Sequence, residues 1–440
     1  MIWKFAYRNL LRNKRRSLST GVAICVGFVG LNLLGAYIYR SKMALDVTSV
    51  YSAQRGHVSI YKKDSIQQYQ IKPKKYVFSL EEQKQVEQVI AEFSDRVDFT
   101  GKKITVPGLL SNGTKSHPVV IYGFDPVAYK KSLTQPSLLE WASDWVLPSQ
   151  RTDADLFIKN PETLSITPKI AELMSFKYPL ISNEAVQIAA RTLDGDLNAI
   201  NADLGAEHTT GMQFLEDTVV LIPIAKAQEL LATDAVESIS VYLKHDVSVN
   251  PFIRDLKEKI SGLSFATDLY KFDAVEINAL HQGTMGFLYV MGGFFVFLIC
   301  TAVSLTIINS LTMGIIERTR EIGTLRAVGF KTKDVVQLFV RESILLSAMS
   351  MAVGILISFL VSSAINAANV RFFPPGASQK IQFVLKWNLY IAGAVFILLF
   401  AIATFSSFFV IKSKLRTKLI ALLNDTSTFD DDSEEEEEAT

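Results

Sequence analysis

Residues 286–316 read GFLYVMGGFFVFLICTAVSLTIINSLTMGII, without a single charged side chain. A bilayer core of about 30 Å needs about 20 helical residues, so this run is long enough to cross a membrane. Because the core contains no water for the backbone polar groups, the run must be helical. Three more blocks have the same character. The sequence therefore predicts four transmembrane helices, at 20–39, 286–316, 343–369 and 387–411.

The composition agrees with a protein that is only partly membrane-embedded. Of the 440 residues, 49% are hydrophobic and 20% charged, and the long stretch 40–285 reads as ordinary globular sequence. The 45 Lys and Arg nearly balance the 44 Asp and Glu, so no overall field indicates a nucleic-acid partner. The two cysteines, Cys25 and Cys300, lie in apolar blocks, which excludes a disulfide framework.

Lysine and arginine near the ends of the spans predict the orientation. Basic residues are dense in 1–19, in 317–342 and in 412–440, and sparse in the short loop 370–386. We therefore expect both termini in the cytoplasm of a bacterial inner-membrane protein, with 40–285 and 370–386 on the periplasmic side. The last segment ends in a run of Asp and Glu, which predicts a disordered acidic tail.

The N-terminal segment 1–19 is predicted to be an amphipathic basic helix on the cytoplasmic membrane surface. Apolar and basic side chains alternate at helical spacing, and a plain positive-inside flank is the alternative reading. The residues expected to anchor it in the lipid headgroups are Trp3, Arg8, Arg12, Arg15 and Arg16.

The stretch 40–285 alternates strand-like and helix-like patterns, which predicts an α+β domain. Ser79 and Glu82 form a capping-box pattern, Thr167 precedes Pro168 as an N-cap, and Asp194-Gly195 is typical of a two-residue hairpin. We expect two parts, with 125–215 inserted into a core built from its flanks. No histidine has metal-ligand spacing, and His208 reads as a solvated loop residue, so we expect no catalysis here.

The cytoplasmic stretch 317–330, ERTREIGTLRAVGF, is the most informative short segment. Its first charges alternate in sign, after which Ile322, Leu325 and Val328 recur along one helical face. Gly329 suits a helix C-cap. A short amphipathic helix with exposed apolar side chains favours a partner groove, and a connector lying on the surface remains equally open.

This stretch, followed by Glu342 and Gly354, resembles the signature of FtsX-like permease domains. These domains belong to the MacB and lipoprotein-releasing (LolC/LolE-like) class of ABC transporters. The N-terminal run Trp3–Arg16 and the layout of one span, a large outer domain and three spans are similar to the same class. The resemblance implies a porter-like outer part with an inserted subdomain, and a permease that transmits mechanical motion.

The resemblance also implies how the chain is powered. The helix between the second and third spans would dock on a cytoplasmic ATPase dimer, through Glu317, Arg318, Glu321, Ile322, Leu325, Arg326 and Gly329. The sequence has no G-x-x-x-x-G-K-[ST] motif, so we expect a separate ATPase subunit to bind ATP and Mg²⁺, and no cofactor or catalytic activity in this chain. A second permease, identical or homologous, and a periplasmic carrier or adaptor would complete the assembly.

Three functions remain open on the sequence. The first is release of lipoproteins from the inner membrane. The second is MacB-like export of a peptide or small amphiphile with an adaptor. The third is FtsX-like regulation of a cell-wall hydrolase without transport. No Asp, Glu, Lys or Arg lies inside the four predicted spans, so coupling to an ion gradient has no candidate residue.

Overall fold

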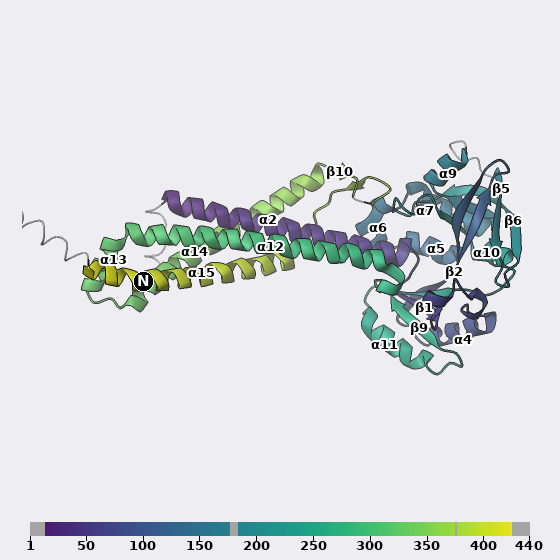
Figure 1. The fold of residues 1–440 in the computed structure, drawn as a ribbon, viewed down its shortest axis with the longest axis horizontal. Coiled ribbons are helices and arrows are strands. Elements are labelled where there is room, and N and C mark those ends of the chain that lie inside the picture. The colour runs from purple at the N-terminus through teal and green to yellow at the C-terminus, as the bar shows by residue number, and fades with distance from the viewer. Residues whose placement is uncertain (1–13, 177–183, 375, 425–440) are drawn as a thin grey trace, which may run out of the picture. The chain divides into compact units, whose positions relative to one another are not determined.

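The computed structural model describes residues 14–176, 184–374 and 376–424 (Figure 1). The chain divides into two compact units. We call the first the helical unit; it lies within Met1–Tyr39, Leu288–Asn369 and Val384–Thr440. We call the second the mixed unit; it comprises Arg40–Phe287 and Val370–Phe383.

Five helices contribute to the helical unit: α2 (Lys14–Val47), α12 (Val275–Glu317), α13 (Thr319–Ala327), α14 (Thr332–Ala367) and α15 (Leu389–Asn424). Within the described residues, four candidate membrane spans meet the length and hydropathy of a crossing: Lys14–Ser52, Val275–Glu317, Lys333–Ala367 and Leu389–Ser413. Each contains most or all of one predicted span. The helices exceed the apolar runs because helical hydrogen bonding continues into polar sequence, as at the start of α14.

The long helices pack around a shared apolar core (Figure 1). It includes Ile24 and Phe28 of α2, Val303 of α12, Met351 of α14 and Leu399 of α15. Close approach needs small residues, as is usual where helices pack without a hydrophobic driving force. A Cβ placed on Gly27 would lie 2.7 Å from Val303 Cγ2. This glycine therefore serves packing within the chain.

The strands of the mixed unit are β1 (Val58–Lys62), β2 (Val97–Ser111), β3 (Ser116–Phe124), β4 (Thr163–Ile166), β5 (Glu184–Arg191), β6 (Leu197–Glu207), β7 (Val219–Pro223), β8 (Ser238–Leu243) and β9 (Thr267–Lys271). They form one sheet in the order β3-β7-β4-β6-β5-β2-β8-β1-β9. An additional pairing joins β3 to β2, so the first six strands of that order close into a ring. A separate short pair is β10 (Arg371–Phe372) with β11 (Ile381–Gln382).

The helices of the mixed unit are α3 (Ser65–Gln68), α4 (Leu80–Ala91), α5 (Pro126–Leu133), α6 (Pro136–Ala142), α7 (Pro148–Thr152), α8 (Leu156–Lys159), α9 (Pro168–Met174), α10 (Ile224–Leu231) and α11 (Val249–Ile260), with a π-helix at Thr48–Ser52. Two predicted N-caps are confirmed. Ser79 and Glu82 form the capping box of α4, and Thr167 Oγ1 accepts from the N–H of Ile170 at the start of α9.

The long strand β2 belongs to two modules. Its first half pairs antiparallel with β8, and β8-β1-β9 continue the sheet. With α4 after β1 and α11 after β8, this is a split β-α-β arrangement (Figure 1). The second half of β2 pairs with β3 and β5 in the ring. The segment 125–215 supplies β4, β5 and β6 to the same sheet, so it is built into a larger insertion that begins within β2.

Two local expectations in this unit are wrong. The β5–β6 hairpin has residues 193–195 as its loop, because Thr192 N–H bonds to Asp196 O at 2.8 Å and Gly195 alone takes a positive φ, of 98°. His208 is not solvated. Its side chain is 1% exposed, and its Nδ1 lies 3.0 Å from Ser165 Oγ. The residues next to His208 in the sequence are polar, so nothing in the sequence indicates that the fold buries this side chain.

The short segment 370–383 belongs to the mixed unit. Gln382 N–H donates to Asp144 Oδ2 at 3.1 Å, and Gln379 Nε2 donates to Asp144 O at 2.5 Å. A further backbone bond joins Ser378 N–H to Gly211 O at 3.2 Å. This segment, read from the sequence as a plain loop between two spans, is therefore tied to 144 and 211 by hydrogen bonds.

Candidate functional site

The helix α13, predicted to couple the chain to a partner, begins beside a buried ion pair. Arg318 lies between α12 and α13 and is only 5% exposed. Its Nη1 donates to Glu342 Oε2 at 3.2 Å, and its Nη2 faces Oε1 at 3.5 Å. The guanidinium also lies over the Phe339 ring, 5.9 Å from the centroid. Because Glu342 and Phe339 both belong to α14, this arginine holds the start of α13 against α14.

A small apolar core fixes the other side of α13. Ile322 is 9% exposed and packs with Ile315 of α12, Val335 and Phe339 of α14, and Ile411 of α15. One side chain of α13 thus contacts three long helices. We expected Ile322 and Val328 on one helical face; instead Ile322 is buried, and Val328 follows the end of α13 at Ala327 and is exposed.

The turn after α13 exposes apolar surface. Val328 is 81% exposed, and Phe330 is also exposed. Between them Gly329 has a φ of 103°, a left-handed conformation that favours glycine. The predicted C-cap role of Gly329 is confirmed by this geometry. The Lys331 N–H then bonds to Asp334 Oδ2 at 3.1 Å, which starts α14.

The last residue of α12 connects to α2. Arg16 Nη1 donates to Glu317 Oε2 at 2.8 Å, an ion pair whose glutamate is 56% exposed. Arg15, also predicted as a membrane anchor, is exposed. The other predicted anchors, Trp3, Arg8 and Arg12, lie outside the described residues. The described part of the basic N-terminal segment therefore contacts the region around α13 through Arg16.

The predicted docking residues thus separate into three groups. Arg318 and Ile322 are buried and hold α13 against the neighbouring helices. Glu317 at the end of α12, Glu321 in α13 and Gly329 in the turn after α13 are exposed. Leu325 and Arg326 belong to α13, and their side chains lie outside the described part of the structure. Among the described residues, no cluster of three or more His, Cys, Asp or Glu side chains could hold a metal ion.

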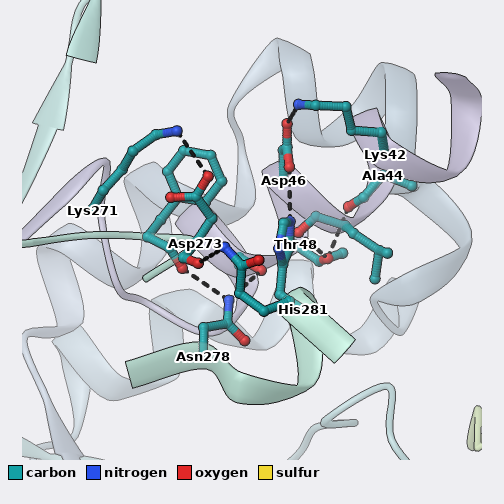
Figure 2. A network of polar contacts seen from close by, with 12 residues as sticks. Lys42, Ala44, Asp46, Thr48, Lys271, Asp273, Asn278 and His281 are labelled. Atoms are coloured by element: carbon teal, nitrogen blue, oxygen red, sulfur yellow. Dashed lines mark hydrogen bonds and ion pairs between the residues drawn. The ribbon is translucent and has the colours of Figure 1, made fainter. Parts of the chain in front are cut away.

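A second polar network lies in the mixed unit, where α2 ends and α12 begins (Figure 2). His281 Nε2 lies 2.8 Å from Asp46 Oδ1, and Lys42 pairs with the same carboxylate. Asn278 Nδ2 donates to Ser49 Oγ and to Phe272 O, both at 2.9 Å. The backbone of Asn278 is non-helical, with φ −151° and ψ 52°, which marks a kink in α12.

This network was not predicted residue by residue. Asp46 and His281 are distant in sequence, and neither has a motif around it. The Asn278 side chain thus links the kink in α12 to Ser49 and Phe272. The network holds the π-helix Thr48–Ser52 against the first turns of α12.

Comparisons with known proteins identify one region of the chain. Residues 293–418 match the family described as FtsX-like permease C-terminal. An uncharacterized ABC transporter permease of Methanocaldococcus jannaschii is 23% identical over 47% of this chain and 51% of its own length. The macrolide export ATP-binding/permease protein MacB of Escherichia coli is 29% identical over 29% of this chain and 20% of its own length. The chain thus spans about half or less of these relatives.

Among solved structures, the periplasmic region of MacB from Actinobacillus actinomycetemcomitans is similar with a TM-score of 0.34 and 11% identity, covering 50% of this chain and 91% of that one. The matched family region begins inside α12 and contains α13, all of α14 and most of α15. It therefore includes the ion pair, the small apolar core and the exposed turn described above. Residues 293–418 are thus similar to the FtsX-like permease C-terminal family, and the similar proteins include ABC transporter permeases, MacB among them.

Proposed function

We propose that this chain is the membrane subunit of an ATP-driven transporter and that a separate ATPase dimer docks on α13 and the turn after it. The observation that carries the proposal is the family match over 293–418. Within this region buried side chains hold α13 against the long helices, while the turn after α13 exposes apolar side chains. The names of the relatives, which include ABC transporter permeases, support the same reading.

The geometry around α13 explains how a force from the ATPase would reach the long helices. Arg318 and Ile322 bind α13 to α12, α14 and α15, so a force on its exposed side displaces those helices together. A helix held by one flexible loop would bend instead. Close packing makes such an interior stiff, which is the property that mechanical coupling needs. Both termini and α13 would face the cytoplasm of the inner membrane, as the basic segments indicate.

For the cargo we propose an amphiphile on the outer side of the membrane. Two cargo classes are consistent with the sequence: lipoproteins released from the inner membrane, and small amphiphiles exported with an adaptor. The relatives named for macrolide export are the specific observation that favours the second class. A second permease copy or homologue would complete either assembly, together with a periplasmic carrier or an adaptor.

The test is purification of the full chain from native membranes in mild detergent, with mass spectrometry of every co-purifying protein and lipid-modified peptide. An ATPase with an adaptor would support export. An ATPase with a second permease and bound lipoproteins would support lipoprotein release, and a cell-wall hydrolase would move the assignment to regulation.

A preparation that retains other membrane complexes and contains no ATPase would refute the transporter proposal. A variant with Val328→Asp provides the internal control for docking. It should lose the ATPase and keep any partner that binds the mixed unit, because Val328 belongs to the helical unit alone.

A further inference from the structure

The mixed unit contains a cavity of about 480 Å³. Its walls come from β1, β2, β3 and β7, from Glu237 just before β8, and from the π-helix Thr48–Ser52, the 208–215 loop and the first turns of α12. Small-molecule sites in proteins usually measure about 300–1,000 Å³ and combine an apolar lining with a few polar groups. The size of this cavity is therefore that of a binding site.

The charge within the cavity is unbalanced. The charged side chains that line it are Arg55, Lys103 and Glu237. Burial raises the pKa of the Glu237 carboxyl and lowers that of the Arg55 guanidinium, so the imbalance rests on two basic side chains against one acidic side chain. Lys103 Nζ lies over the Tyr122 ring, 5.7 Å from the centroid. The lining therefore favours an anion over a cation.

Arg55 is the group with most capacity to bind that anion. Its Nε donates to Ile277 O at 3.0 Å, and among the described residues it forms no ion pair with a carboxylate. A guanidinium has five N–H donors in a planar fork that matches a carboxylate or phosphate. One donor on a carbonyl leaves the rest of the fork for a ligand.

One part of the wall is apolar and partly aromatic, beside uncharged polar side chains such as Gln150 and Thr209. Phe124, Trp145, Leu215 and Leu221 line the cavity, and Phe214, which also lines it, is 58% exposed. A half-exposed phenylalanine at a cavity is unfavourable in water and becomes favourable when an apolar ligand covers it. The ligand should thus carry both an acidic group and an apolar chain.

We propose that this cavity binds an anionic amphiphile whose acidic group pairs with Arg55 and whose apolar part packs against Trp145, Phe214 and Leu221. The proposal concerns binding by the mixed unit and requires neither ATP nor an ATPase. Its failure would therefore leave the transporter proposal intact, and the reverse also holds.

The experiment uses the full chain in lipid nanodiscs without nucleotide, and decanoate that carries a diazirine on its chain. After irradiation, labelled peptides are mapped by mass spectrometry. We expect labelling in 45–61 and 208–222, with labelling of the membrane helices as the background set by lipid partitioning. Competition by unlabelled decanoate against unlabelled decyl phosphate distinguishes a carboxylate ligand from a phosphate ligand.

Four variants and one further probe decide the assignment. Arg55→Gln should reduce labelling of these segments by about tenfold, because a charge-assisted hydrogen bond is lost. Arg55→Lys should retain more labelling than Arg55→Gln. Ala53→Trp, at an exposed residue of the lining, should fill the cavity and abolish labelling. Arg254→Gln is the matched control, since that arginine is exposed and does not line the cavity. A decanol that carries the diazirine should label the unaltered chain as weakly as the decanoate probe labels Arg55→Gln.

Equal labelling by decanol and decanoate would overturn the role of Arg55. Labelling confined to the membrane helices, or unchanged by Ala53→Trp, would overturn the site itself. If Arg55→Gln does not fold, the comparison of the two probes on the unaltered chain still decides, because it changes only the ligand charge.

Discussion

Arg318 and Glu342 form a buried ion pair, with Arg318 Nη1 3.2 Å from Glu342 Oε2 and both side chains less than a tenth exposed. The pair joins the residue before α13 to α14 across 24 positions of sequence. Burying two charges is costly and adds little stability by itself, whereas removing one partner leaves the other uncompensated. The pair thus acts as a positional constraint on α13.

Glu342→Gln should therefore lower the free energy of unfolding by about 3 kcal/mol, as for other broken buried pairs. It should also reduce the stimulation of the ATPase partner, because α13 loses its attachment to α14. Thermal unfolding of the purified chain and ATPase assays on the reconstituted complex measure the two effects.

The double variant Arg318→Met with Glu342→Leu separates the effect of the ion pair on stability from its effect on the position of α13. Since apolar residues of similar volume can replace a buried pair at little cost, the double variant should unfold near the wild-type temperature. Unfolding of Glu342→Gln at the wild-type temperature would contradict the burial of the pair.

Val328→Asp should uncouple the partner without destabilising the chain. Val328 is 81% exposed, and exposed substitutions usually change stability by about 0.5 kcal/mol or less. A charge at the centre of an apolar contact would weaken docking strongly. The measurement is binding of the ATPase, followed by its stimulation.

Leu197→Asp is the control for that change. Leu197 is 80% exposed and belongs to the mixed unit, so the same substitution should leave ATPase binding unaltered. Normal docking of Val328→Asp would show that the turn after α13 is not part of the interface.

Gly329→Ala and Gly323→Ala should have opposite effects. At Gly329, φ is 103°, and an alanine there is strained by about 1–2 kcal/mol, although no atom lies within 4 Å of the new Cβ. Gly323 lies inside α13, and an added Cβ there also meets nothing within 4 Å. Alanine at 323 should stabilise the helix by up to about 1 kcal/mol.

Thermal unfolding of both variants tests the expected loss of stability at position 329 and the expected gain at position 323. Since both changes add the same methyl group to an open position, a difference between them reports the backbone conformation alone. Equal melting temperatures would mean that 329 does not hold a left-handed conformation.

The stability of the mixed unit should fall as the pH falls below about 6.5. Burial lowers the pKa of His208 from 6.5 to about 3 and that of His57 to about 4. The unfolded chain binds protons at these side chains from about pH 6.5 downward while the folded chain stays neutral there. Their destabilising effect is therefore absent above pH 6.5 and grows as the pH approaches 4.

Hydrogen exchange of the mixed unit at several pH values measures this trend, after correction for the intrinsic exchange rates. His208→Gln should reduce the slope by up to one proton, or about 1.4 kcal/mol per pH unit. A slope that His208→Gln does not alter would contradict the burial of a neutral histidine at 208.

Local features were predictable because their causes lie within a few residues. Four uncharged runs are long enough to span a bilayer whatever surrounds them, and four helices of that kind are present. The N-caps at Ser79 and Thr167 and the left-handed turn at Gly329 depend on hydrogen bonds or backbone angles inside one short segment. The same reasoning failed by one residue for the β5–β6 loop, where the strand pairing sets the loop length.

The sequence by itself thus determined the four long apolar helices, two helix N-caps and the position of α13. Only the tertiary structure decided which polar residues are buried, because burial depends on partners far along the chain. Arg318 faces Glu342, His208 faces Ser165, and Asp144 binds the 370–383 segment through contacts that no local periodicity encodes. The cavity around Arg55 arises in the same way, since strands between residues 58 and 223 meet there only after the sheet has formed.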